Sequence, residues 1–123
     1  MIEPLGKKLK PSTIQTIYEQ LEFQRVNRPS WVAYHFPRID ERGRIEYGDV
    51  EALTEREADS VRHLLSSQIL FGRKQSARQR SRAIGLLRDN EDENGASEWE
   101  IRNKQMEEAL ADLCEVFGMK YPL

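Results

Sequence analysis

Residues 54–72, TEREADSVRHLLSSQILFG, decide the fold, because they combine a helix start signal with a long apolar stripe. Thr54 and Glu57 have the spacing of a capping box, in which each side chain satisfies an otherwise unpaired backbone amide. Apolar residues then recur at helical spacing on one face: Ala58, Val61, Leu64, Leu65, Ile69 and Phe71. The stretch predicts an amphipathic helix that packs on a core and ends near Gly72.

An earlier helix is predicted by the same signals. Ser12 and Gln15 form a capping box. One apolar stripe follows them: Ile14, Ile17, Tyr18 and Leu21. This helix should fade by Asn27, because Pro29 disfavours helical geometry at the residue before it.

The C-terminal third predicts two further helices separated by an acidic loop. Residues 75–88 form one helix, and residues 89–97, DNEDENGAS, contain almost nothing apolar and predict an exposed loop. A third capping box, Ser97 with Glu100, starts the last helix. It runs to Phe117, and Gly118 suits the position after its end.

Residues 31–48 predict a β-hairpin instead of a helix. They are rich in β-branched and aromatic residues, interrupted by Asp40–Gly43, where Gly43 would take a positive φ in the loop. The expected fold is therefore mainly α: one domain over residues 1–123, of about four helices, with a hairpin inserted after the first helix. Residues 1–11 form a basic tail.

The bulk composition narrows the class of protein. Apolar residues make up 38% and charged residues 33% of 123 residues, which suits one charged globular domain. Cys114 is the only cysteine, so an intramolecular disulfide is excluded. The chain has no apolar run of membrane-spanning length and no signal-peptide pattern near its start. These features predict a cytoplasmic protein without a membrane partner.

Charge is segregated along the chain. Residues 73–88 carry six bases and no acid, whereas residues 89–100 carry six acids and no base. Lys74, Arg78 and Arg82 form an i, i+4, i+8 stripe that could follow a phosphate backbone. The alternatives are a solvated basic face and one neutralised by the acidic loop.

The predicted hairpin offers a second nucleic-acid contact. Its bases Arg38, Arg42 and Arg44 lie close in sequence to aromatic residues that could stack on unpaired nucleobases. In the alternative, the aromatic residues belong to the core and the arginines to its rim. The leading hypothesis is a small regulatory or accessory protein that binds nucleic acid and catalyses no reaction.

The last helix carries an apolar seam with spacings of 4, 3, 4, 3 and 4: Trp99, Asn103, Met106, Leu110, Leu113 and Phe117. In a two-stranded coiled coil, Asn103 would occupy an a position and fix the register. The favoured interpretation is an ordinary bundle helix, because Ala109 and Val116 widen the apolar face. We expect this seam to share one core with the earlier helices. The alternative function is a protein-interaction module, of the inhibitor or immunity type, that uses the acidic loop and this helix, and it includes a possible homodimer.

Catalysis has little support in the sequence. His35, His63 and Cys114 lack metal-ligand spacing, and no phosphate-binding glycine loop is present. Glu108, Asp112 and Glu115 share a helical stripe of the kind that could hold magnesium in a helical nucleotide hydrolase, a remote alternative. The stripe lies opposite the apolar seam, so we expect it to face solvent. No cofactor, metal or catalytic residue is predicted.

Overall fold

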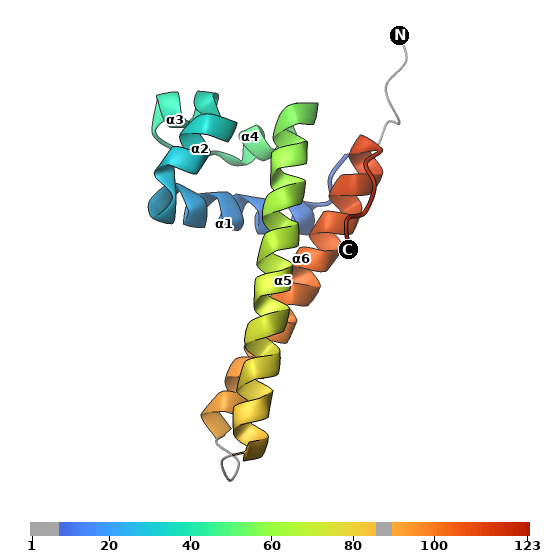
Figure 1. Ribbon diagram of the computed structural model, residues 1–123. Helices are drawn as coiled ribbons and strands as arrows, with labels where there is room; N and C mark the ends of the chain where they lie inside the picture. The colour runs from blue at the N-terminus through green and yellow to red at the C-terminus, as the bar shows by residue number, and fades with distance from the viewer. Residues whose placement is uncertain (1–7, 86–89) are drawn as a thin grey trace.

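The computed structural model describes the backbone of residues 8–85 and 90–123, and the side chains of residues 8–78 and 98–123. All of its regular elements are helices (Figure 1): α1 (Pro11–Asn27), α2 (Pro29–His35), α3 (Pro37–Arg42), α4 (Tyr47–Glu51), α5 (Glu55–Gly85) and α6 (Asn90–Phe117). The prediction of a mainly helical protein is confirmed, and the prediction of a β-hairpin is wrong, because the described residues contain no strand.

Two prolines and a helical apolar spacing explain why residues 31–48 are helical. Pro29 and Pro37 occupy the first turns of α2 and α3, where a missing backbone amide costs nothing. Val32, Phe36 and Ile39 are spaced by four and three residues and are all buried. The helical period therefore prevails over the β propensity of the individual side chains.

The positive φ predicted for Gly43 is present, with a different role. Its φ is 76°, and it ends α3 instead of turning a hairpin. Its amide donates to the carbonyls of Ile39 and Asp40, which are left without helical partners at the end of α3.

The long helices α5 and α6 run side by side, and their pairing builds the molecule (Figure 1). The smaller helices α1 to α4 gather around one half of the pair, and the other half extends beyond them as a two-helix arm. One core joins these parts, as predicted: Ile17, Leu21, Val61, Leu65, Met106, Leu110 and Leu113 all lie in it.

The prediction that a helix ends near Gly72 is wrong, because α5 continues through this residue to Gly85. Gly72 is buried against α6, where a Cβ atom would lie 2.1 Å from Oδ1 of Asn103. The Asn103 amide group donates to the carbonyl of Ile69 at 3.1 Å. Glycine is therefore used here for the close approach of two helices and does not stop the first one.

Of the three predicted capping boxes, the one at α5 is confirmed. The Thr54 hydroxyl accepts from the Glu57 amide at 3.1 Å, and the Glu57 carboxylate accepts from the Thr54 amide at 3.0 Å. The box at Ser97 is wrong, because α6 already begins at Asn90. The expected acidic loop is consequently helical over residues 90–97, while residue 89 lies outside the described residues.

The start of α1 is held by a residue that is distant in sequence, instead of by a local capping box. The helix begins at Pro11, and no side chain caps it, so the predicted box of Ser12 and Gln15 is wrong. The amide of Lys10 instead donates to the carboxylate of Asp112 on α6 at 2.9 Å. Asp112 is buried, so the expectation that its stripe faces solvent is wrong for this residue, whereas Glu108 and Glu115 are exposed as expected.

The end of α6 agrees with the sequence. The helix stops at Phe117, and Gly118 follows with a φ of 64°. The amide of Met119 then donates to the carbonyl of Cys114 at 2.8 Å, as in a Schellman ending. The glycine directs the last residues back towards α5, where Arg62 donates to the carbonyl of Lys120 at 3.1 Å.

We predict that Gly72→Ala destabilises the protein by about 1–3 kcal/mol. Alanine is the better helix former by about 1 kcal/mol, but its methyl group would displace Asn103 and break the bond to Ile69. Urea unfolding followed by circular dichroism measures the change. The double variant Gly72→Ala/Asn103→Ala should lose less than the sum of the two single losses. A Gly72→Ala protein that is more stable than the parent would contradict the close contact.

Candidate nucleic-acid interface

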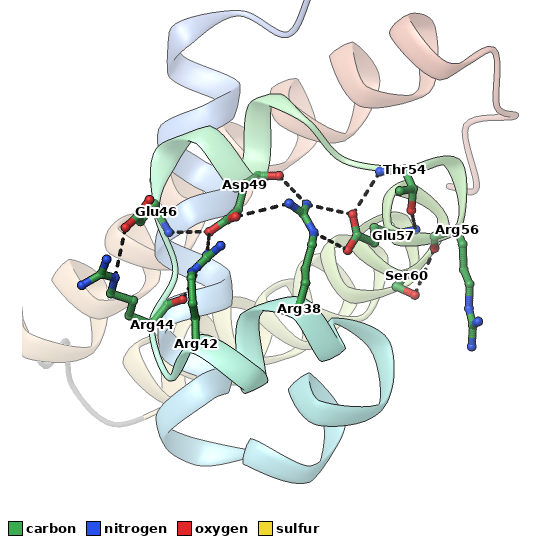
Figure 2. A network of polar contacts seen from close by, with 9 residues as sticks. All are labelled: Arg38, Arg42, Arg44, Glu46, Asp49, Thr54, Arg56, Glu57 and Ser60. Carbon is green, nitrogen blue, oxygen red and sulfur yellow. Dashed lines mark hydrogen bonds and ion pairs between the residues drawn. The ribbon is translucent and has the colours of Figure 1, made fainter.

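A network of arginines and carboxylates holds α3, α4 and the start of α5 together (Figure 2). Arg38 donates to both oxygens of Glu57 at 2.8 Å, a bidentate pair. It also donates to the carbonyl of Asp49 at 2.8 Å and to its carboxylate at 3.2 Å. Arg38 therefore bridges two helices from a third and is committed to the fold.

The other two bases predicted for this region are also paired with acids. Arg42 donates to the carboxylate of Asp49, and Arg44 pairs with Glu46 at 3.0 Å. Asp49 is buried and also caps α4 by accepting from the amide of Glu46 at 2.8 Å. The structure thus gives Arg38 and Arg42 a structural role, whereas Arg44 forms an exposed pair.

The network shifts the ionisation of its two buried acids. Burial alone would raise the pKa of Glu57, but hydrogen bonds from Arg38 and Thr54 outweigh it and hold the pKa below its ordinary value. Burial would also raise the pKa of Asp49. Hydrogen bonds from the Glu46 amide and from Arg42 outweigh this effect, so the pKa of Asp49 is lowered. Both acids stay ionised at neutral pH and keep the arginines in place.

The free bases lie instead along an exposed face of α5, opposite its buried face, and only Phe71 of this line reaches a ring of α6, that of Trp99. The residues Val61, Leu65, Ile69, Gly72 and Ser76 are buried and form the opposite, inward face. The outer face has spacings of 4, 3, 4, 4, 3 and 4 residues, which place its members in one line: Arg56, Ser60, His63, Ser67, Phe71, Lys74 and Arg78. We call this line the outer stripe; all of its members except Ser60 are exposed.

The outer stripe contains no acid, and its bases are unpaired. Arg56, Lys74 and Arg78 form no ion pair with any residue whose side chain is described. Figure 2 shows the Arg56 guanidinium directed away from the arginine network. Of the flanking acids, Glu55 directly precedes Arg56 in the chain, and Asp59 pairs with Arg62 at 2.7 Å and lies 3.6 Å from His63. The stripe therefore keeps most of its positive charge.

Two acids of α6 contact residues of α5 that are not members of the outer stripe. Glu107 pairs with Arg73 at 2.8 Å, and Glu100 accepts from Ser76 at 3.4 Å. The side chain of Arg82, the third base of the predicted stripe, lies outside the described residues, as do those of residues 79–97. Among the described side chains, the acids of α6 do not pair with the outer stripe.

Another free base, Arg28, lies among aromatic rings at α2, next to the start of the outer stripe. An open hollow of about 510 Å³ is lined by Asn27, Arg28, Pro29, Ser30, Trp31, Tyr34 and His35. The guanidinium of Arg28 stands over the Trp31 ring, 5.8 Å from its centroid. Nδ1 of His35 hydrogen-bonds to the hydroxyl of Ser60 at 2.9 Å, which joins the hollow to α5.

The apolar seam predicted on the last helix is occupied within the monomer. Asn103, Met106, Leu110 and Leu113 are buried, while Trp99 and Phe117 are half-buried. Phe71 meets Trp99 edge to face at 5.7 Å between ring centroids. The seam therefore packs on α5 and the core, in the manner of the bundle helix that the sequence favoured.

No group of three or more His, Cys, Asp or Glu side chains in the described part of the chain could hold a metal ion. Burial raises the pKa of the Cys114 thiol, and the thiol is buried beside the carbonyl of Lys120. Another hollow, of about 250 Å³ between α1 and α6, is lined by small polar side chains with Glu19 and Glu108 and has no base to balance them.

Arg56 and His63 also have a signal in the sequence. Both residues continue the helical spacing of Lys74 and Arg78 backwards along α5. A predicted helix end at Gly72 separates the two pairs and hides their common face. A single helix over residues 55–85 would have placed all four on it.

Comparison with known proteins assigns no family. No family model matches the chain, no curated protein matches it, and no solved structure matches it. Among the described helices, none has a stretch long and apolar enough to cross a membrane. The functional conclusion therefore depends on the chemistry of the chain's own surface.

We predict that Arg38→Gln destabilises the protein by roughly 2–3 kcal/mol. This is less than the ~3–5 kcal/mol of a fully buried pair, because Arg38 is about a third exposed. The loss arises because the buried Glu57 keeps its charge and loses its only arginine partner, while Asp49 keeps Arg42 alone. Arg44→Gln is the control, since its pair with Glu46 is exposed and should contribute less than about 1 kcal/mol. Equal losses in the two variants would contradict the structural role of Arg38.

Acid should weaken the fold through the same carboxylates. Because the folded pKa values of Asp49 and Glu57 are lowered, their contribution is present above the unfolded values, about 3.9 and 4.3. It is lost as the pH falls through the lower folded values. Urea unfolding at pH 7 and at pH 3 should therefore show a smaller stability at pH 3. Glu57→Gln should reduce this pH dependence, and an unchanged pH dependence would contradict the assignment.

Proposed function

We propose that this protein binds nucleic acid without catalysing a reaction, as a small regulatory or accessory factor. The contact surface is the outer stripe of α5, with Arg56, Lys74 and Arg78 as its phosphate-binding bases. The arginines of the network, Arg38 and Arg42, support the fold and have no direct part in binding. Lys74 and Arg78 thus remain from the stripe predicted from the sequence, and Arg56 takes the place of the bases of the predicted hairpin.

The observation that carries this proposal is the line of unpaired bases on an otherwise acid-free face. The protein has a net charge of −2, so attraction of a polyanion has to be local. At physiological ionic strength, charges are screened over about 8 Å. Acids on the far side of α6 then reduce the field at the outer stripe only weakly.

The shape of the stripe also suits a phosphate backbone. Arg56 and Arg78 are 22 positions apart in one helix, a length of roughly 33 Å at 1.5 Å per residue. A rigid, straight row of bases can contact phosphates at several points along one strand. Contacts of this kind position the nucleic acid and carry little sequence information.

A protein-binding function is the second candidate, and exposed apolar side chains favour it. Leu70, Phe71 and Ile101 are each about half exposed or more on the two-helix arm. Exposed apolar groups that lie close together mark protein contacts in many proteins. A second copy of this chain, or another protein, could cover them, and sedimentation of the purified protein over a range of concentrations tests the first case.

We predict that Lys74→Gln/Arg78→Gln abolishes or strongly weakens nucleic-acid binding. Each lost phosphate contact should lower the slope of log K against log salt by about 0.7–0.9, so two contacts should lower it by about 1.5. Fluorescence anisotropy of a labelled oligonucleotide, measured from low to physiological salt, gives both quantities.

Lys104→Gln/Lys120→Gln is the matched control, because it removes the same charge from exposed positions that are not members of the outer stripe. This control should bind nearly as the parent protein does. Equal effects of the two double variants would show that binding depends on net charge alone. If the parent protein binds neither DNA nor RNA at low salt, the proposal fails and the protein-binding candidate takes its place.

A further inference from the structure

The hollow at α2 has an aromatic wall. Trp31 is half-buried against the core, whereas Tyr34 is 70% exposed. His35 lies between them, 4.6 Å from the Trp31 ring and 4.9 Å from the Tyr34 ring, measured between centroids. One ring is thus fixed by packing and another is open to solvent, an arrangement that can receive a flat ligand.

The charge around this wall is positive. The residues that line the hollow include Arg28 and no acid. Burial and then the nearby basic side chains, Arg56 first, lower the pKa of His35, so Arg56 and Arg28 lie close enough to affect the ring. Arg28 and Arg56 form no ion pair with a described side chain. A ligand for this hollow would carry negative charge beside a planar group.

The hollow is continuous with the outer stripe. The hydrogen bond between His35 and Ser60 joins α2 to α5 at a member of the stripe. Arg56 lies one turn earlier on the same line of α5. A phosphate chain that follows the outer stripe towards the start of α5 therefore reaches the aromatic wall.

We propose that the hollow at α2 stacks an unpaired nucleobase, so that the protein prefers single-stranded to double-stranded nucleic acid. The exposed ring of Tyr34 provides the stacking surface, next to Trp31, whose ring Arg28 already covers. Arg28 and Arg56 bind the adjoining phosphates. This inference rests on the proposed function and specifies its ligand. In a duplex the bases are stacked on each other and paired, so their faces are unavailable to these rings, whereas a single strand exposes them.

Fluorescence of Trp31 tests the inference. Trp99→Phe leaves Trp31 as the only tryptophan and keeps an aromatic ring against Phe71. This protein is titrated at low salt with an oligothymidylate and an oligouridylate of about 12 nucleotides, and with a duplex of the same length. We expect both single strands to bind more tightly than the duplex and to quench Trp31. The ratio of the two single-strand affinities measures any preference for DNA or RNA.

Tyr34→Ala provides the second arm of the test. Because the Tyr34 ring is exposed, its removal should leave the helical circular dichroism signal unchanged. We expect the affinity for the single strands to fall about 5- to 50-fold. Affinity for the duplex should stay unchanged. Tyr121→Ala, which removes an exposed ring from the C-terminal residues away from the hollow, is the control and should bind like the parent.

The outcomes separate the two proposals. Salt-dependent binding with equal affinity for strand and duplex, unquenched Trp31 and no effect of Tyr34→Ala would overturn the base-stacking site and leave the outer stripe as the binding surface. Absence of binding to any of the three probes at low salt would overturn the proposed function, and the inference would fall with it.

Discussion

The close packing of α5 on α6 at Gly72 is the constraint on which the rest of the structure depends. Asn103 reaches over Gly72 to bond the carbonyl of Ile69, and a side chain at Gly72 would fill the space that Asn103 occupies. The contact fixes which face of α5 is covered by α6. The opposite face, with Arg56, Lys74 and Arg78, must then point outward in one line.

The arginine network decides which of the remaining bases are available at the surface. Arg38 and Arg42 hold the buried acids Asp49 and Glu57, and these contacts fasten α3 and α4 to the start of α5. The same contacts consume the bases that lie closest in sequence to the aromatic residues. The free bases beside the rings are Arg28, which directly precedes α2, and Arg56, which comes from α5.

The sequence predicted the features that depend on local chemistry. The capping box of Thr54 and Glu57, the glycine after Phe117 and the shared core are all confirmed. The failures have two causes, one in competing local signals and one in tertiary contacts. Aromatic and β-branched residues suggested strands, although proline positions and the spacing of Val32, Phe36 and Ile39 favoured helices. The tertiary cause acts at Gly72, which suggested a helix end because its partner, Asn103, lies 31 positions away. It also acts at Arg38, because nothing in the sequence indicates that Arg38 pairs with Glu57.

The central claim is that nucleic acid lies along the outer stripe of α5, and backbone amide chemical shifts test it most directly. A titration of the isotopically labelled protein with oligothymidylate at low salt would report the contact surface residue by residue. We expect the largest shift changes at Arg56, His63, Lys74 and Arg78, and at Trp31 to His35 beside them. Changes confined to the outer face of α6, around Ile101 and Glu108, would contradict the account.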